Sequence, residues 1–307
     1  MILGPAVSII VPTRDALAWL PGAIESIGMD PNVEILVVDD GSTDGTLAWL
    51  GEQARIDSRL RFMHGTHAGP SRARNLAVGA ARAPLVAFLQ PGDRWLPGKL
   101  QAQIDLHANQ PHVGFSFTDY RLLTSAGLPN GTGFAAWPRF SAQYGRAEAP
   151  FVMDRPLSAL YAEAIVSTST VVARTALLRE VGGFSTGLYT AEDWDLWLLL
   201  ARKVPVAVVP CVLADQYDER SGGLTAGPDL RVMAMTLIAE RHRDAALSQD
   251  PSAEPAFQAR LSAAKADAAM AAGHRLEALI QRVRAFGHQP TSTTARAAAG
   301  AFRRLIG

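Results

Sequence analysis

Residues 35–38 (ILVV) form an unbroken apolar run that passes directly into the carboxylates Asp39 and Asp40 and then into a turn rich in Gly, Ser and Thr. A run of this kind, bounded by turn residues, predicts a β-strand buried on both faces. The two aspartates then lie at the carboxyl end of the strand, where open α/β sheets bind ligands. Adjacent carboxylates are costly there unless they receive hydrogen bonds or face a cation. Nucleobase imino groups, ribose hydroxyls and metal ions could each satisfy them.

Strand and helix patterns alternate along the first third of the chain. The expected strands cover residues 7–11, 33–38, 61–63 and 84–89. Segments with helical spacing of apolar residues separate them, and this alternation predicts the α/β class with a parallel, doubly wound sheet. Later strands are expected at 113–120, 168–173 and 204–213. Residues 124–150, rich in Gly, Pro and Ala, are expected to form a surface loop or an excursion from the sheet.

The last third of the chain is expected to be helical. The expected helices cover residues 192–202, 228–247, 254–286 and 295–306. Residues 258–307 carry eight basic and two acidic side chains. We place a soft boundary near Ala226, which divides the chain into a domain of residues 1–225 and a C-terminal helical region of residues 226–307.

Composition excludes several classes of protein. Lys+Arg and Asp+Glu both number 29, so no overall field favours nucleic acid as a partner. The single cysteine, Cys211, excludes an intrachain disulfide or a cysteine-based zinc site, and its apolar neighbours predict a buried thiol. No leader pattern is visible, and charged residues and prolines interrupt the apolar residues 196–214, so we expect a cytoplasmic protein without a membrane span.

Polar residues gather where the expected strands end. The clusters are residues 12–15, 39–40 and 90–93 and, at a helix start, 191–194. Because strand ends of a parallel sheet share an edge, these clusters can converge in space. Each also has a plain structural interpretation, since Asp15 and Asp44 could cap helices and the acids at 192 and 193 could complement a helix N-terminus.

Taken in order, five segments resemble the family 2 glycosyltransferases. They are residues 7–15 (VSIIVPTRD), 35–46 (ILVVDDGSTDGT), 69–81 (GPSRARNLAVGAA), 84–97 (PLVAFLQPGDRWLP) and 192–198 (EDWDLWL). The resemblance covers about residues 5–225. It implies a GT-A type, Rossmann-like, mostly parallel sheet flanked by helices, followed here by a C-terminal helical extension.

The resemblance also implies roles for the matching residues. Those that would bind the nucleotide are Pro12, Thr13, Arg14, Asp39, Asp40, Arg74 and Gln90, with Asp40 reading the imino proton of the base. Asp193 would be the general base that deprotonates the acceptor hydroxyl, a task that suits a carboxylate with a raised but accessible pKa. Glu192 and Trp194 would lie on the acceptor side, although the helical spacing of Trp194 and Trp197 favours core packing.

Two departures from the family pattern concern the diphosphate end. Family members usually carry Asp-x-Asp after the third strand, whereas this chain has Gln90, Pro91 and Gly92 and keeps only Asp93. Mg²⁺ or Mn²⁺ would therefore be held weakly, if at all. Arg220 stands where members often have a metal-binding His, and arginine binds phosphate well. Arg220 could replace part of the metal's charge, or it could be an ordinary surface arginine.

The function implied is an inverting transfer of a sugar from a nucleoside diphosphate (UDP, dTDP or GDP) to a hydroxyl of a glycan or lipid-linked acceptor. Such an enzyme would serve polysaccharide or glycoconjugate synthesis. The alternatives are a non-catalytic sugar-nucleotide-binding protein and a nucleotidyltransferase. The basic C-terminal helices could lie on the inner face of a membrane. They could equally pack against the core or a second copy, and packing is slightly favoured because aromatic residues are scarce there.

Overall fold

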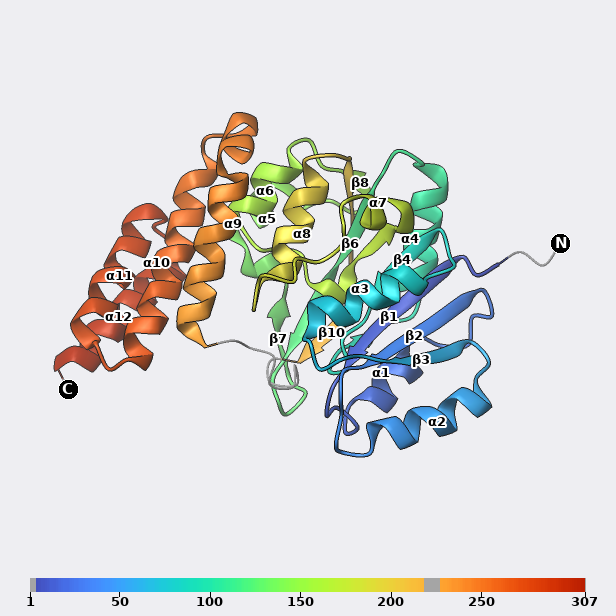
Figure 1. The fold of residues 1–307 in the computed structure, drawn as a ribbon. Coiled ribbons are helices and arrows are strands. Elements are labelled where there is room, and N and C mark those ends of the chain that lie inside the picture. Colours follow the sequence, from blue (N-terminus) through green and yellow to red (C-terminus); the bar gives the residue numbers. More distant parts are fainter. Residues whose placement is uncertain (1–3, 218–226, 307) are drawn as a thin grey trace. The chain divides into compact units, whose positions relative to one another are not determined.

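The computed structural model describes residues 4–217 and 227–306 (Figure 1). Arg220, expected near the diphosphate, lies outside the described residues. Contacts within the chain divide it into two compact units. We call residues 1–154, 165–186 and 199–224 the sheet unit, and residues 155–164, 187–198 and 225–307 the helical unit. The boundary expected near Ala226 stays a prediction.

The sheet unit contains a ten-stranded sheet in the order β3-β2-β1-β4-β9-β6-β10-β5, with β7 beside β6 and β8 beside β10. The strands are β1 (Val7–Thr13), β2 (Val33–Asp39), β3 (Leu60–His64), β4 (Leu85–Phe88), β5 (Arg94–Trp95), β6 (Phe115–Leu123), β7 (Pro129–Thr132), β8 (Phe151–Val152), β9 (Val172–Arg174) and β10 (Val206–Tyr217). β1 is parallel to β2 and β4, and β2 to β3, which confirms the expected parallel half. β9 is antiparallel to β4 and β6, so the other half is mixed.

The helices of the sheet unit are α1 (Leu20–Ser26), α2 (Thr46–Ile56), α3 (Pro70–Ala80), α4 (Lys99–Asn109), α5 (Pro138–Tyr144) and α7 (Thr175–Glu180), with short 3-10 helices at Phe134–Ala136 and Thr168–Thr170. α8 (Glu192–Ala201) begins in the helical unit and ends in the sheet unit. The strand and helix positions predicted for the first 110 residues are confirmed to within a few residues at each end.

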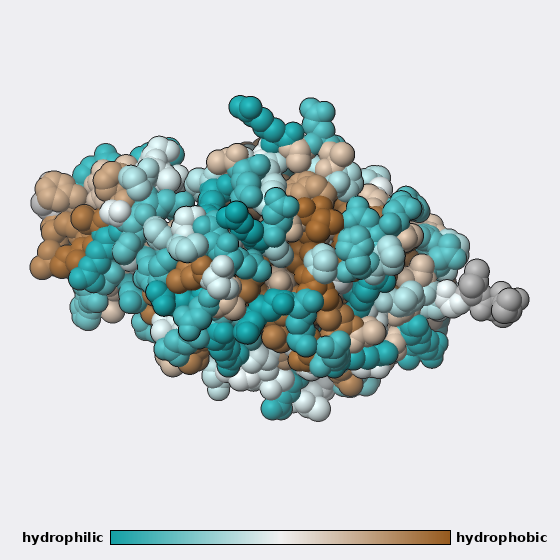
Figure 2. Space-filling view, turned by 90° about the horizontal axis from the view of Figure 1, so that it is seen from above, coloured by the Kyte–Doolittle hydropathy of each residue, from teal (hydrophilic) through white to brown (hydrophobic). Residues whose placement is uncertain are grey.

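The helical unit consists of α6 (Pro156–Ala162), the first turns of α8, α9 (Pro228–Gln249), α10 (Ala253–Ala271), α11 (Arg275–His288) and α12 (Ser292–Ile306). α10 packs against α9 and α11, and α12 packs against α11. Within the described residues no helix combines the length and the apolar character needed to cross a membrane. Figure 2 shows polar side chains over much of the visible surface, with apolar patches between them.

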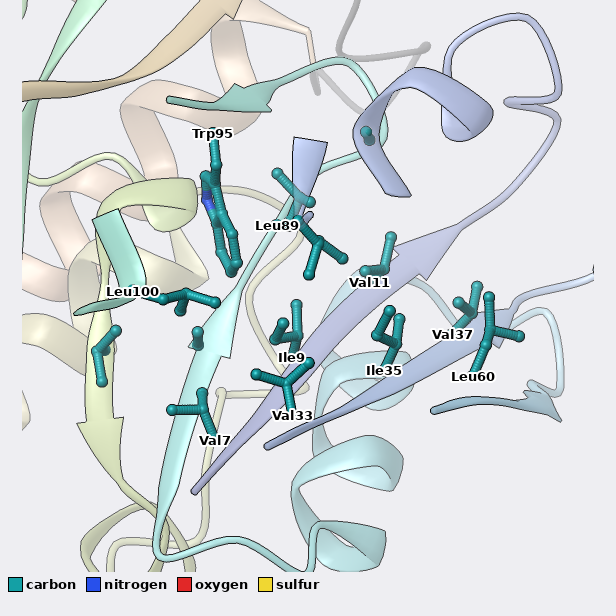
Figure 3. Packing of buried hydrophobic residues seen from close by; sticks show 14 of the residues in the cluster. Val7, Ile9, Val11, Val33, Ile35, Val37, Leu60, Leu89, Trp95 and Leu100 are labelled. Carbon is teal, nitrogen blue, oxygen red and sulfur yellow. The ribbon is translucent and has the colours of Figure 1, made fainter. Parts of the chain in front are cut away.

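The core of the sheet unit explains why 35–38 is continuously apolar. Every residue of β1 and β2 is buried, because helices cover both faces of these strands. Ile9 and Ile35 point to the face where Leu20 of α1 and Leu50 of α2 are buried (Figure 3). α3 packs against the other face of β1 and β2, and the alternate residues of these strands point toward it. Burying each such side chain contributes about 1.5–3 kcal/mol.

Four expectations were wrong. The strand expected over 168–173 begins later, because Thr168–Thr170 form a 3-10 helix and β9 covers Val172–Arg174. Residues 124–150 are not a plain loop, because β7 and α5 form there around an aromatic cluster in which Phe140 lies 4.7 Å from Phe134, ring centre to ring centre. The helix expected over 254–286 is two helices, since Gly273 adopts a left-handed conformation (φ +80°) that ends α10. Cys211 is exposed, at a point where β10 shifts register between Val209 and Val212.

Candidate functional site

The carboxyl ends of β1 and β2 bring the first candidate residues together. The parallel register pairs Pro12 with Val38 and Thr13 with Asp39, and the Asp40 N–H donates to the Thr13 carbonyl at 2.8 Å. The Thr13 side chain is 4% exposed, and its hydroxyl has no hydrogen-bond partner among the described residues. A buried, unpaired hydroxyl costs about 1–3 kcal/mol. This strand end is therefore suited to a polar ligand.

The paired carboxylates that end β2 each have hydrogen-bond donors of their own. Asp39 accepts the hydroxyl of Ser42 and, at 3.3 Å, its N–H. Asp40 accepts the N–H groups of Ala68, at 3.1 Å, and Gly69, at 2.8 Å. These donors explain how two adjacent acids can be almost completely buried here. Each oxygen keeps a further lone pair that a ligand could use.

The loop before α3 passes tightly over Asp40. A Cβ on Gly65 would lie 2.4 Å from an Asp40 carboxylate oxygen, so only glycine fits at this position. His67, in the same loop, adopts a left-handed backbone conformation (φ 56°) beside Gly41. Such a conformation costs about 1–3 kcal/mol and persists only where the surroundings enforce it. The loop is therefore held in one shape around Asp40.

A second set of hydrogen bonds joins the β1 and β2 loops. The Asp15 carboxylate accepts the Thr43 N–H at 2.7 Å, and the Asp15 N–H donates to the Ser42 hydroxyl at 2.8 Å. Asp15 is also left-handed (φ 48°). Burial opposes ionisation of Asp44, but hydrogen bonds from Thr46 and Leu17 outweigh it and hold the pKa of Asp44 below its usual value. Asp44 accepts the N–H of Thr46, the first residue of α2, but it is not the helix cap, because Gly45 holds the N-cap position.

Arg14 and Arg74 differ in accessibility. The Arg14 side chain is 40% exposed, and its Nε lies 3.8 Å from an Asp15 carboxylate oxygen. The Arg74 side chain is 5% exposed, and its guanidinium carbon lies 5.1 Å from the centre of the Phe184 ring. Its neighbour Asn75 exchanges two 2.8 Å hydrogen bonds with the main chain of Phe184. Sequence reasoning missed Phe184, because nothing near it in the chain indicates this contact.

The residues after β4 form a tight, buried turn. The Asp93 N–H donates to the Gln90 carbonyl at 3.0 Å, and the Gln90 side chain is partly buried. The Asp93 carboxylate accepts the Ser169 hydroxyl at 2.5 Å. Burial raises the pKa of Asp93 to about 7, hydrogen bonds from Ser169 and the Tyr217 N–H oppose the rise, and the nearby charge of Asp215 adds to it. Ser169, which sequence reasoning also missed, thus completes this turn.

Among the described residues, the donor groups near Asp93 fit a divalent cation poorly, because they are engaged in hydrogen bonds of their own. Both Asp93 oxygens lie in a buried hydrogen-bonded site, and Asp215 is paired with Arg121 through two 2.8 Å hydrogen bonds. The described ranges contain no group of three or more His, Cys, Asp or Glu side chains that could hold a metal. Hard cations need several oxygen ligands, and the Asp-x-Asp acids that usually supply them are Gln90 and Gly92 here.

The candidate catalytic residues begin α8 in the helical unit. Ala191, directly before the helix, is left-handed (φ 57°). Glu192 is 8% exposed, whereas Asp193 is partly exposed and accepts the Trp194 N–H at 2.8 Å. Asp195, which was not singled out in the sequence, is buried and accepts hydrogen bonds at 3.0 Å from Arg241 and His242. The start of α8 is thus held by the left-handed backbone of Ala191 before it and by the ion pair between Asp195 and Arg241 in its first turn.

The acceptor-side role expected for Trp194 needs correction. The residue is 6% exposed, its Nε1 donates to the Leu160 carbonyl at 2.7 Å, and its ring stacks with Phe257. The guanidinium carbon of Arg260 lies 4.7 Å from the ring centre. Burial lowers the pKa of Arg260 to about 10. Trp194 therefore packs inside the helical unit, as its helical spacing favours.

The segment that contains the ends of β1, β2 and β4 also resembles known proteins. Residues 8–138 match the sequence model of glycosyl transferase family 2. A Bacillus subtilis glycosyltransferase named for teichuronic acid biosynthesis is 34% identical over 128 residues, which cover 41% of this chain and 50% of the relative. An Escherichia coli UDP-Glc:alpha-D-GlcNAc-diphosphoundecaprenol beta-1,3-glucosyltransferase is 27% identical over 67% of this chain and 73% of its own length. The chain spans only 30% of the length of an uncharacterized glycosyltransferase of Rickettsia felis.

Solved structures share the fold. Residues 1–349 of Staphylococcus aureus TarS, crystallised with UDP-GlcNAc, superpose with a TM-score of 0.64 at 18% identity, covering 97% of this chain and 91% of that one. The mannosyltransferase PcManGT of Pyrobaculum calidifontis, in complex with GDP-Man and Mn²⁺, superposes with a TM-score of 0.59 at 20% identity, covering 100% of this chain and 82% of that one. At these identities the likeness shows the fold alone.

Proposed function

Because residues 8–138 belong to glycosyl transferase family 2, we propose that this chain, whose sheet is of the GT-A type, is an inverting glycosyltransferase. It takes a sugar from a nucleoside diphosphate and adds it to an acceptor hydroxyl in glycoconjugate synthesis. The observation that carries the proposal is the β1–β2 edge, where the buried hydroxyl of Thr13, beside Asp39 and Asp40, has no hydrogen-bond partner in the part of the chain that the structure describes. A nucleoside supplies hydroxyl and imino groups that match such a site.

In the reaction that we propose, the carboxylate of Asp193 takes the proton of the acceptor hydroxyl. The acceptor oxygen forms a bond to the anomeric carbon while the bond from that carbon to the diphosphate breaks, which inverts the configuration. The nucleoside diphosphate leaves with the electron pair. Asp193 suits this role because it is partly exposed, whereas its neighbours Glu192 and Trp194 are buried. A base must reach the proton that it removes.

We further propose that the diphosphate charge is met by arginine and not by a cation that the protein holds. The buried, hydrogen-bonded state of Asp93 and the Arg121 pair on Asp215 support this proposal. Arg220 is the expected partner of the phosphates, and Arg14, exposed at the end of β1, is a second candidate. Arginine binds phosphate through two parallel hydrogen bonds and keeps its charge at any physiological pH.

The acceptor is proposed by analogy with one relative. The Escherichia coli relative is named for a lipid-linked acceptor, GlcNAc-diphosphoundecaprenol. An acceptor of this chemical class, a sugar on a polyprenyl diphosphate, suits the present chain, which we place in the cytoplasm at the inner face of a membrane. The donor nucleotide is UDP, dTDP or GDP, and TarS, which shares the fold, was crystallised with a UDP sugar.

The full chain tests this function in two assays. A thermal-shift panel of UDP, dTDP, GDP and their sugars should single out one nucleotide, because at equal concentrations the ligand that binds the folded chain more tightly stabilises it more. Turnover of that donor should release the nucleoside diphosphate. A nucleotidyltransferase would instead form the nucleotide sugar from a nucleoside triphosphate and a sugar phosphate with release of pyrophosphate, so this pair of substrates is assayed in parallel.

Asp193→Asn separates an enzyme from a binding protein. The amide keeps the shape of the side chain but cannot take a proton, so turnover should fall at least about 100-fold while nucleotide affinity persists. The matched control is Asp154→Asn, an exchange at another aspartate that lies outside the proposed site. Full turnover in Asp193→Asn would show that the base is another residue.

A further inference from the structure

α11 buries two alanines and a glutamine and exposes four large apolar side chains. Its buried residues are Ala278, Gln281 and Ala285. Large apolar side chains are exposed instead, namely Leu276 (60%), Ile280 (44%), Val283 (54%) and Phe286 (40%). Positions 276, 280 and 283 follow helical spacing, so they share one face. A globular helix normally has the opposite arrangement, and this face is therefore a contact surface.

The exposed face of α11 continues onto the end of α12. Arg275 Nη1 donates to the Arg304 carbonyl, so the start of α11 lies beside the last turn of α12. That turn presents Phe302, which is 53% exposed, next to the exposed Arg303 and Arg304. We call Leu276, Ile280, Val283, Phe286 and Phe302 the apolar strip. Figure 2 shows apolar surface gathered on the C-terminal helices, at the left of the view.

The charge around the apolar strip has one sign. Residues 275–306 contain six arginines and a single acid, Glu277. Asp267 of α10 neutralises Arg282, and His274 lies 3.7 Å from Glu277. The exposed arginines at 275, 284, 296, 303 and 304 have no acid paired with them in the described residues. Large apolar side chains with a positive border are typical of helices that lie in the plane of an anionic membrane.

A second copy of the chain fits this surface less well. In a two-fold dimer the same patch faces itself, so the arginines that border the strip would meet arginines of the other copy. Like charges brought together in this way oppose association. Anionic lipid headgroups give each arginine an opposite charge, and the acyl chains accept the aliphatic and aromatic side chains.

We propose that the α11–α12 surface docks on an anionic phospholipid bilayer, with the apolar strip entering the headgroup boundary and the arginines contacting lipid phosphates. This inference stands apart from sugar transfer, although docking would hold the chain where a lipid-linked acceptor lies.

Vesicle flotation of the full chain tests the proposal. The wild-type chain should float with vesicles of phosphatidylglycerol and phosphatidylcholine and should remain at the bottom with phosphatidylcholine alone. Ile280→Asp with Val283→Asp should reduce the partition coefficient at least about tenfold, since both side chains leave the boundary. Arg303→Gln with Arg304→Gln should reduce it about fivefold for each arginine.

Ile56→Asp is the matched control, because Ile56 is 79% exposed but lies on α2 of the sheet unit. It should float like the wild type. Circular dichroism and nucleotide affinity should be unchanged in all variants, so loss of flotation cannot be confused with loss of folding or of the proposed donor site. A wild-type chain that fails to float, or one that is a dimer until Ile280→Asp and Val283→Asp split it, overturns the proposal.

Discussion

The hydroxyl of Ser169 donates a 2.5 Å hydrogen bond to the Asp93 carboxylate and accepts the Gln90 N–H at 3.0 Å. One side chain thus joins the two ends of the turn that follows β4. Asp93 therefore has a structural role in this turn, although the two acids of Asp-x-Asp are absent. Asp93 shapes the turn, and its buried carboxylate is poorly placed to serve a cation as well.

Ser169→Ala should lower the free energy of unfolding by about 1.5–3 kcal/mol, because it leaves a buried carboxyl and an N–H without their shared partner. Urea unfolding measures the change. Ser248→Ala, which removes an exposed serine hydroxyl bonded to the Ala245 carbonyl, should change stability by less than about 0.5 kcal/mol. Equal effects of the two substitutions would contradict the structural role of Ser169.

Thr13→Val should weaken binding of the preferred nucleoside diphosphate about 5- to 20-fold without destabilising the free chain. Valine has nearly the same shape but no hydroxyl, so the unpaired group in the free protein disappears together with its contact to the ligand. Calorimetric titration and thermal unfolding give the two values. Thr170→Val is the control with the opposite pattern, since the buried hydroxyl of Thr170 is bonded to the Ser167 carbonyl at 2.7 Å. It should lose stability and keep affinity.

Lys99 should make stability depend on pH. Burial lowers its pKa to about 7, against an ordinary value of 10.5, although its ammonium lies 4.3 Å from the centre of the Trp95 ring. Between these two pH values the unfolded chain binds the proton and the folded chain does not. The free energy of unfolding should therefore rise with pH, by at most about 1.4 kcal/mol per unit.

Lys99→Met should remove that rise, which urea unfolding at several pH values between 7 and 10 would show. Lys203→Met is the control, because Lys203 is exposed and pairs with Glu180 on the surface. The Lys203→Met curve should run parallel to that of the wild type. If the Lys99→Met curve also ran parallel, Lys99 would be charged in the folded chain throughout this range.

Turnover should survive a chelator, because the described residues provide no set of oxygen ligands for a divalent cation. Arg220→Ala should lower kcat/KM about 10- to 1000-fold, the usual range for one group that stabilises charge on a leaving group. Initial rates with and without EDTA measure the first effect, and steady-state kinetics measure the second. Arg55→Ala, an exposed arginine on α2, is the control. Loss of turnover in EDTA with recovery in Mn²⁺ would overturn the proposal of arginine in place of a metal.

Local sequence patterns predicted most strands and helices of the sheet unit. They could not predict contacts between residues that lie far apart in the chain. The apolar run at 35–38 identified β2, because a strand that is buried on both faces has apolar residues at successive positions. Gly273 could have divided α10 from α11, since a glycine after an apolar helix is a common end signal. Ser169 carries no comparable mark. Its contact to Asp93 joins residues 76 apart in the chain, and only the insertion of β9 between β4 and β6 brings them together.

The candidate site shows the same difference between local patterns, which the sequence reveals, and distant contacts, which it does not. Asp39, Asp40 and Thr13 were placed correctly at one sheet edge, because parallel register follows from the alternation of strands and helices. The ion pair of Asp195 with Arg241, and its hydrogen bond from His242, went unnoticed, since polar side chains at helix starts have many possible partners. For Trp194, helical spacing already favoured core packing over the acceptor contact that the resemblance implied, and the residue is buried.

The position of β9 has a consequence for synthesis of the chain. The segment that matches the family ends at residue 138, but β4 is completed on one side by β9, which the ribosome makes more than thirty residues later. Until then a nascent chain presents β4 as an open edge, which invites pairing with another chain. Slow translation after residue 138 would therefore lengthen the time during which β4 can pair with another chain. Truncated versions of this protein should be designed to extend beyond β10, not to stop where the family likeness does.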